Sequence, residues 1–97
     1  MSHVIYIEWH VTPFRAEEFL RIWRPAAARA LAFGASSWSL TRNSEDPLHI
    51  RQSATFERRE DFERYWYSDE ITAAREEAMS YYGKPVLPVW HSLVGAE

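Results

Sequence analysis

Arg75 is the residue whose type and position best suit chemistry. It follows Ile71 by four residues and precedes Ala78 by three, so a continuous helix turns it toward the same side as an apolar stripe. A guanidinium at the edge of an apolar cavity can hold a phenolate, an enolate or a carboxylate through charge-assisted hydrogen bonds. We therefore take Arg75 as the candidate catalytic residue. The alternative is that its stem lies along the stripe and its head pairs with a nearby Glu at the surface.

Tryptophan is the second candidate group. Trp9, Trp23, Trp38 and Trp66 all fall on predicted core faces, which is a large amount of indole for so short a chain. Aromatic walls of this kind can hold a flat, ring-shaped ligand. The alternative is that these residues are ordinary core.

Metal and nucleophile chemistry have little support. His10, His49 and His91 lie on predicted strands, but no His-x-His or Glu-x-x-His pairing accompanies them. The chain has no Gly-rich phosphate loop, no cysteine nucleophile and no recognisable Ser/His/Asp order. We therefore expect neither a metal site nor a cofactor.

Composition limits the partners. The 97 residues are 46% hydrophobic and carry a net charge of -3, with acidic and basic residues interspersed, so we expect no nucleic acid as a partner. The chain lacks cysteine, which suits a cytoplasmic location. It shows neither a signal peptide nor the roughly 18 to 20 apolar residues of a membrane span. We expect one small domain over residues 1–97, stabilised by forming a homodimer.

The first half of the chain predicts a strand, a helix and a strand. Residues 4–11 alternate with period two, as a strand does. Thr12 and Pro13 then form a helix start signal, and Gly34 ends the apolar helical stripe. Pro25 lies inside this helix, so we expect a kink or a break near Trp23 and Arg24. Residues 36–42 alternate again, as a second strand does.

The second half repeats the order. Residues 48–56 predict a third strand, residues 57–67 a helical piece, and Ser68 a new helix start with an acidic first turn. The second piece ends before Gly83 and Pro85, and residues 86–94 predict the last strand. The order βαββαβ indicates an α+β, ferredoxin-like fold with a four-stranded antiparallel sheet and helices on one face.

The other face of this sheet is predicted to be polar and to form the dimer interface. The residues expected on it are Tyr6, Glu8, His10, Ser37, Ser39, Thr41, His49 and Arg51. Glu8 and Arg51 should form an ion pair there. On the helix side, Arg75 and Trp66 should border one cavity between the helices and the sheet.

The stretch Phe62-Glu63-Arg64-Tyr65-Trp66-Tyr67-Ser68-Asp69 and the following Ala73-Ala74-Arg75 carry a resemblance to a known family. Together with the strand, Thr-Pro and long helix of the first half, they resemble the antibiotic biosynthesis monooxygenase-like group of the dimeric α+β barrel superfamily. The resemblance implies a dimeric α+β barrel. Members include cofactor-free oxygenases of phenolic substrates, haem-degrading oxygenases, quinol oxygenases and proteins of unknown role.

At several positions this chain differs from the enzymes of the group, and these differences limit which of their activities we expect. Where haem-degrading members carry Asn, Trp and His, this chain aligns Trp9, Tyr65 and Arg75, so we expect no haem degradation. Where phenol oxygenases hold the phenolate, it aligns Gln52, Phe56 and Phe62, of which only Gln52 is polar. Together with the tryptophans, this comparison defines the expected ligand pocket, which comprises Trp9, Trp23, Trp38, Gln52, Tyr65 and Trp66.

Two hypotheses for the function follow. The first is a cofactor-independent monooxygenase, or a related enzyme, that acts on an aromatic or polyketide-like small molecule oriented by Arg75. The second is a non-catalytic dimeric module of the same fold that binds a small ligand or serves in a stress response. The missing catalytic polar set favours the second, and the fold alone does not separate them.

Overall fold

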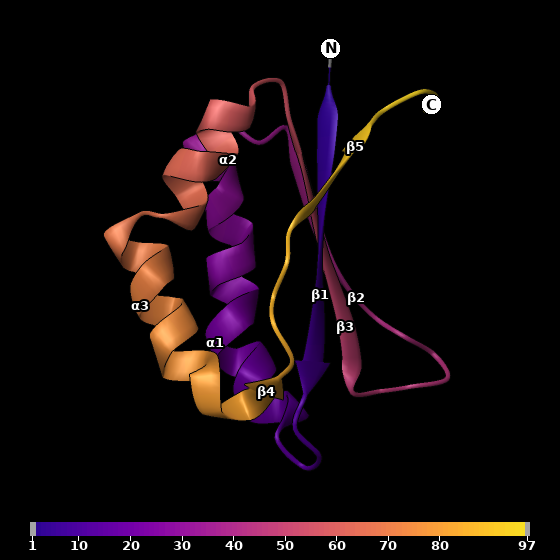
Figure 1. Ribbon diagram of the computed structural model, residues 1–97, viewed down its shortest axis with the longest axis vertical. Helices are drawn as coiled ribbons and strands as arrows, with labels where there is room; N and C mark the ends of the chain where they lie inside the picture. Colours follow the sequence, from indigo (N-terminus) through magenta and orange to yellow (C-terminus); the bar gives the residue numbers. More distant parts are fainter. Residues whose placement is uncertain (1, 97) are drawn as a thin grey trace.

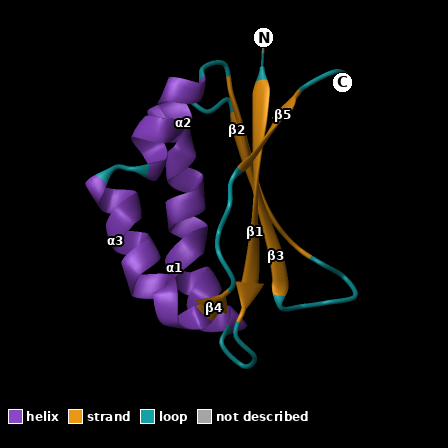
Figure 2. Cartoon of the chain, viewed as in Figure 1, coloured by secondary structure: helices purple, strands orange, loops and turns teal. Residues whose placement is uncertain are grey.

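The computed structural model describes residues 2–96. Its central strand is β1 (His3–Val11), which pairs along its length with β3 (His49–Phe56); β3 pairs in turn with β2 (Ser37–Arg42). All pairings in this sheet are antiparallel. The helices lie together on one face of the sheet (Figures 1 and 2). This arrangement confirms the predicted α+β, ferredoxin-like fold.

The last strand differs from its prediction. Two short strands replace it, β4 (Tyr82–Gly83) and β5 (Val89–Ser92), so the sheet has five strands where four were predicted. Both pair with β1, β4 near its end at Val11 and β5 near its start at His3. Pro85 and Pro88 lie between them, and a proline has no N–H to donate to a strand ladder.

The first helix also differs from its prediction. It begins at Ala16, later than the Thr-Pro signal suggested, because Phe14 adopts a positive φ of 68° and residues 12–14 form a turn. Helix α1 (Ala16–Ala28) then continues through Pro25, so a break at Trp23 and Arg24 is wrong, and the alternative of a kink there stays a prediction. The regular helix instead tightens into the 3₁₀ segment η1 (Arg29–Phe33) after Pro25.

Other predicted helix signals are confirmed. Gly34 ends η1 in the left-handed conformation at φ 103°, and an added Cβ there would lie 3.0 Å from Asp61 Oδ2. The second helical region has two pieces, α2 (Arg59–Trp66) and α3 (Asp69–Ala78), and the 3₁₀ turn η2 (Met79–Tyr81) follows α3. Ser68 caps α3, since its hydroxyl accepts a hydrogen bond from the Ile71 amide at 3.2 Å. None of the helices in residues 2–96 is long and apolar enough to cross a bilayer.

The strand register separates two faces as predicted. Ile5 pairs with Ala54, Ile7 with Gln52 and Trp9 with Ile50, and these side chains face the helices and the hydrophobic core. Alternate residues form the outer face of the sheet, which no helix covers (Figure 1). Glu8 lies opposite Arg51 there, and Arg51 Nε donates to Glu8 Oε1 at 3.1 Å and Oε2 at 3.0 Å, which confirms the predicted ion pair.

Candidate functional site

Gln52 lies at the centre of a hydrogen-bonded cluster inside the core. Its Oε1 accepts from Trp9 Nε1 at 3.2 Å and from Trp23 Nε1 at 2.8 Å. Its Nε2 donates to the Tyr65 hydroxyl at 3.1 Å, and that hydroxyl donates to the Ala26 carbonyl at 2.7 Å. Gln52 is 1% exposed and both of its side-chain polar atoms have partners, so the cluster joins the sheet to α1 and α2.

Five of the six predicted pocket residues therefore meet in one place, since the Trp66 ring also packs against Trp9, Trp23 and Tyr65 with ring centres 6.3, 6.2 and 6.5 Å apart. Trp9, Trp23, Gln52 and Tyr65 are all fully buried, and the Trp9 and Trp23 rings lie 4.6 Å apart. Burial raises the pKa of Tyr65 to about 12, although the Gln52 hydrogen bond lowers it. Tyr65 is thus a neutral hydrogen-bonding group near pH 7. The part these residues play in binding a ligand stays a prediction.

Arg75 and Trp66 are in direct contact. The Arg75 guanidinium carbon lies 4.4 Å from the centre of the Trp66 ring, a cation–π arrangement. Arg75 Nη2 also donates to the Trp66 carbonyl at 2.7 Å and to Thr72 Oγ1 at 3.4 Å. Arg75 is half-buried, and its guanidinium binds the carbonyl at the C-terminal end of α2. The alternative that it pairs with a surface Glu is therefore not what the structure shows.

One atom of Arg75 has no partner. Among residues 2–96, Arg75 Nε is the buried side-chain polar atom left without a hydrogen bond. A buried N–H of a charged group is costly to leave unmatched. Its surroundings include Tyr82, whose pKa is raised by burial and partly lowered again by the nearby Arg75 charge. The geometry therefore provides a fixed cation with a spare donor beside an indole.

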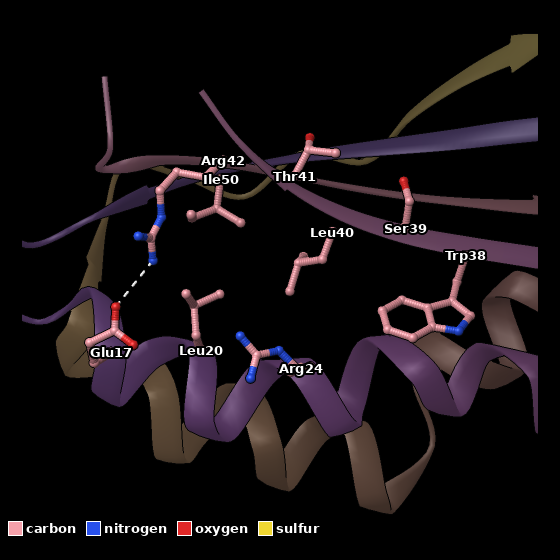
Figure 3. Close-up of a pocket in the computed structure, with 9 residues that line it drawn as sticks. All are labelled: Glu17, Leu20, Arg24, Trp38, Ser39, Leu40, Thr41, Arg42 and Ile50. Atoms are coloured by element: carbon pink, nitrogen blue, oxygen red, sulfur yellow. Dashed lines mark hydrogen bonds and ion pairs between the residues drawn. The ribbon is translucent and has the colours of Figure 1, made fainter. Parts of the chain in front are cut away.

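Trp38, the remaining predicted pocket residue, lies elsewhere. It lines a groove of about 470 Å³ between α1 and the edge strand β2 (Figure 3). The full lining is Glu17, Leu20, Arg24, Trp38, Ser39, Leu40, Thr41, Arg42 and Ile50. A smaller hollow of about 250 Å³ lies between α1 and α3, and one of about 400 Å³ lies on the outer face of the sheet. Arg75 and Trp66 line none of these three, so the cavity expected beside them is not among them.

The histidines of the outer face contact aromatic and acidic neighbours. His10 stacks on His49 with ring centres 4.9 Å apart, and His49 Nε2 lies 2.9 Å from Glu8 Oε1. His91 meets the edge of the Tyr6 ring at 4.9 Å. Across the described part of the chain, no group of three or more His, Cys, Asp or Glu is arranged to hold a metal ion.

Two cationic residues of the groove were missed by sequence reasoning. Arg24 points into the space between α1 and β2, and Arg42 reaches toward Glu17 across it (Figure 3). In the sequence both resemble ordinary surface arginines. The sequence did hold one signal for the groove. Trp38 and Leu40 lie on one face of β2, and Arg42 is the last residue of that strand.

Comparisons with known proteins identify the fold. No family model matches the chain, and no protein of curated function matches it either. Solved structures do match. The protein named "putative antibiotic biosynthesis monooxygenase" from Nitrosomonas europaea has a TM-score of 0.88 at 14% identity, with 96% of this chain and 90% of that chain covered. A protein of the same name from Caulobacter crescentus gives 0.85 at 17% identity, with 97% and 91% covered.

A third structure carries a more specific name. A variant of SnoaB, described as a cofactor-independent oxygenase from Streptomyces nogalater, matches with a TM-score of 0.82 at 11% identity, covering 98% of this chain and 95% of that chain. At such low identity the likeness speaks for the backbone arrangement. The chain therefore has the ferredoxin-like α+β fold of the structures named antibiotic biosynthesis monooxygenases.

Proposed function

We propose that this protein is a small cofactor-independent monooxygenase, or a related enzyme, that acts on an aromatic or polyketide-like compound bound as an anion beside Arg75. One observation carries the proposal, the buried Arg75 Nε–H that has no acceptor among residues 2–96 while its guanidinium is held over Trp66. An anionic oxygen of the substrate would supply that acceptor, which requires the side chains around Arg75 to move apart, because none of the three hollows reaches Arg75. The name of SnoaB, which shares the fold, supports this class of chemistry.

The chemistry needs little from the protein. A substrate carbon that carries two hydrogens between aromatic rings loses one as a proton, and the resulting anion gives its electrons to O₂ and forms a peroxide. Loss of water from the peroxide leaves a carbonyl, so CH₂ and O₂ become C=O and H₂O, and the substrate itself is the reductant. Arg75 would stabilise the anion, and the aromatic surroundings would exclude water.

The second candidate function is a non-catalytic small-ligand-binding module of the same fold. The Gln52 cluster favours it, because Gln52, Trp9, Trp23 and Tyr65 use their side-chain polar atoms on one another and on the Ala26 carbonyl. Among the polar side-chain hydrogens of these four residues, the second Nε2–H of Gln52 is the one left without a partner in residues 2–96, so the cluster has little hydrogen bonding left for a transition state. This alternative retains the ligand and Arg75 but omits the reaction with O₂.

Oxygen uptake and ligand binding together separate the two functions. Purified protein would be mixed with a panel of anthrone-like and naphthol-like anions in an oxygen electrode, and binding would be measured by calorimetry. Arg75→Ala should weaken binding by about 1.5 to 3 kcal/mol, the range for a hydrogen bond to a charged group. Arg21→Ala is the matched control, since Arg21 is an exposed arginine on α1.

Each outcome has a meaning. Binding with Arg75-dependent oxygen uptake supports the oxygenase, and Arg75-dependent binding without uptake supports the binding module. Equal affinity of wild type and Arg75→Ala for every ligand in the panel would remove Arg75 from both functions.

We also propose that the protein forms a homodimer through the outer face of its sheet. Val89, which is 51% exposed, lines the hollow on this face, and Leu87, Leu93 and Val94 of the same C-terminal segment are 71%, 42% and 98% exposed. A chain this short gains stability by burying such surface. Sedimentation equilibrium at micromolar concentration should give twice the chain mass of 11.4 kDa. A stable monomer would exclude this dimer.

A further inference from the structure

The groove between α1 and β2 combines an apolar floor with a cation at its rim. Leu20 and Ile50 are buried beneath it, and Trp38 and Leu40 are half-buried on its wall. Figure 3 shows the Arg24 guanidinium directed into the space that these side chains surround. The volume of about 470 Å³ lies within the usual range of small-molecule sites, about 300 to 1,000 Å³.

The charges of the groove favour a single negative charge. Arg42 Nη2 is 3.4 Å from Glu17 Oε1, so these two side chains largely neutralise each other. Arg24 forms no ion pair or hydrogen bond with another side chain of residues 2–96. The lining thus carries one uncompensated positive charge, although the whole chain carries a net charge of -3.

We propose that this groove is a second binding site, which takes a small aromatic monocarboxylate. The ring lies against Trp38 and Leu40, where stacking and burial stabilise it. The carboxylate accepts hydrogen bonds from the unpaired Arg24 guanidinium, whose planar donors suit a two-oxygen acceptor. The site is on the β2 side of the sheet and shares no lining residue with the Arg75 contact, so it does not depend on the proposed oxygenase activity.

Binding of 2-naphthoate tests the proposal on the full chain. Calorimetry should show binding to wild type, and Trp38→Phe should remove the ligand-induced change in tryptophan fluorescence that arises from this site. The neutral isostere 2-naphthamide should bind at least tenfold more weakly than 2-naphthoate, because it cannot form the charged pair with Arg24. Equal affinity for the acid and the amide would refute the role of charge.

Three substitutions locate the site. Arg24→Gln should weaken 2-naphthoate binding at least tenfold, whereas the control Arg21→Gln, an exposed arginine on the same helix outside the groove lining, should leave it unchanged. Glu17→Gln frees Arg42 and should tighten binding several-fold. Arg24 and Glu17 are exposed, so all three variants should fold like wild type, which circular dichroism checks.

The variants also separate this site from the Arg75 site. If Arg75→Ala abolishes 2-naphthoate binding while Arg24→Gln does not change it, the ligand binds beside Arg75 and the groove proposal is wrong. If Arg24→Gln and Arg21→Gln behave alike, or if wild type does not bind 2-naphthoate at millimolar concentration, the proposal is also wrong. A change in sedimentation mass with the Arg24 variant, without ligand, would indicate that a second chain occupies the groove instead.

Discussion

Replacing Gln52 by leucine should destabilise the protein far more than its single side chain suggests. Leucine has a similar volume but no polar atom, so the Trp9 and Trp23 indole N–H groups lose their shared acceptor inside the core. Each buried donor left without a partner costs about 1 to 3 kcal/mol. The apolar leucine regains part of this through burial, so we expect a net loss of about 2 to 5 kcal/mol.

Urea unfolding followed by tryptophan fluorescence measures this loss. With a urea dependence of about 1 to 3 kcal/mol per molar, the midpoint should fall by roughly 2 M at one fixed protein concentration. Ser53→Ala is the matched control, because Ser53 is next to Gln52 in β3 but faces outward and contacts Ser39 Oγ at 2.6 Å. That change should cost about 1 kcal/mol or less.

A double variant identifies the cause of the loss. Trp23→Phe removes the donor of the 2.8 Å bond to Gln52, so Gln52→Leu should cost at least about 1 kcal/mol less in that background than in wild type. A Gln52→Leu protein within about 1 kcal/mol of wild type, or strictly additive effects in the double variant, would refute the view that Gln52 is a necessary acceptor.

Three further predictions concern other contacts. Burial raises the Tyr65 pKa to about 12 from 10, so the stability that this neutral phenol contributes is complete below pH 10 and is lost as the pH rises from 10 to 12. In urea unfolding curves, the Tyr65→Phe variant should lack about 2 to 3 kcal/mol of the loss of stability that wild type shows over this pH range. An equal loss in the variant and in wild type would contradict the assignment to Tyr65. Trp66→Ala should lower the free energy of unfolding by about 3 to 5 kcal/mol, because Trp66 is 5% exposed and its ring contacts the Arg75 guanidinium. Thermal unfolding measures this loss, with Tyr67→Ala as the control because Tyr67 is 72% exposed. Glu8→Gln should lower the free energy of unfolding of the monomer by about 1 kcal/mol or less, since the Arg51 and Glu8 side chains are 57% and 32% exposed. A larger loss of stability that depends on protein concentration would place this ion pair inside an interface.

Much of the fold was predictable because local patterns and the tertiary structure agree. Alternation marked β1, β2 and β3 with their inner and outer faces, and this correctly paired Glu8 with Arg51. Gly34 and Ser68 gave helix boundaries through local conformation and capping, which depend on few neighbours. The errors occurred where distant contacts prevailed. The Thr12 and Pro13 signal became part of a turn, and Pro25 was accommodated within a packed helix.

The candidate site was predictable in membership but not in arrangement. Period and spacing placed Trp9 and Trp23 in the core, and the family resemblance pointed to Gln52 and Tyr65. The hydrogen bonds among these residues depend on the rotation of two helices above the sheet, which no spacing encodes. Arg75 and Trp66 were predicted to border one cavity; the structure shows the Arg75 guanidinium lying over the Trp66 ring, and the cavity itself stays a prediction. The groove was missed because Arg24 and Arg42 come from separate elements that only the tertiary fold brings together.

Because two short strands, β4 and β5, stand in place of one long C-terminal strand, that edge of the sheet should unfold before the rest. β1 is held on one side by the eight-residue β3 and on the other by β4 and β5, which have two and four residues. Pairing β5 with the start of β1 closes a loop that contains nearly the whole chain, so β5 gains little from local contacts and should join the sheet late in folding. Amide protons of residues 89–92 should exchange with solvent through local fraying. The amide protons in the hydrogen bonds between β1 and β3 should exchange only on global unfolding. The C-terminal strand should therefore open while the cluster of Gln52, Trp9, Trp23 and Tyr65 stays closed, because the Trp90 ring of β5 contacts the rings of His3 and Phe62, which lie outside that cluster.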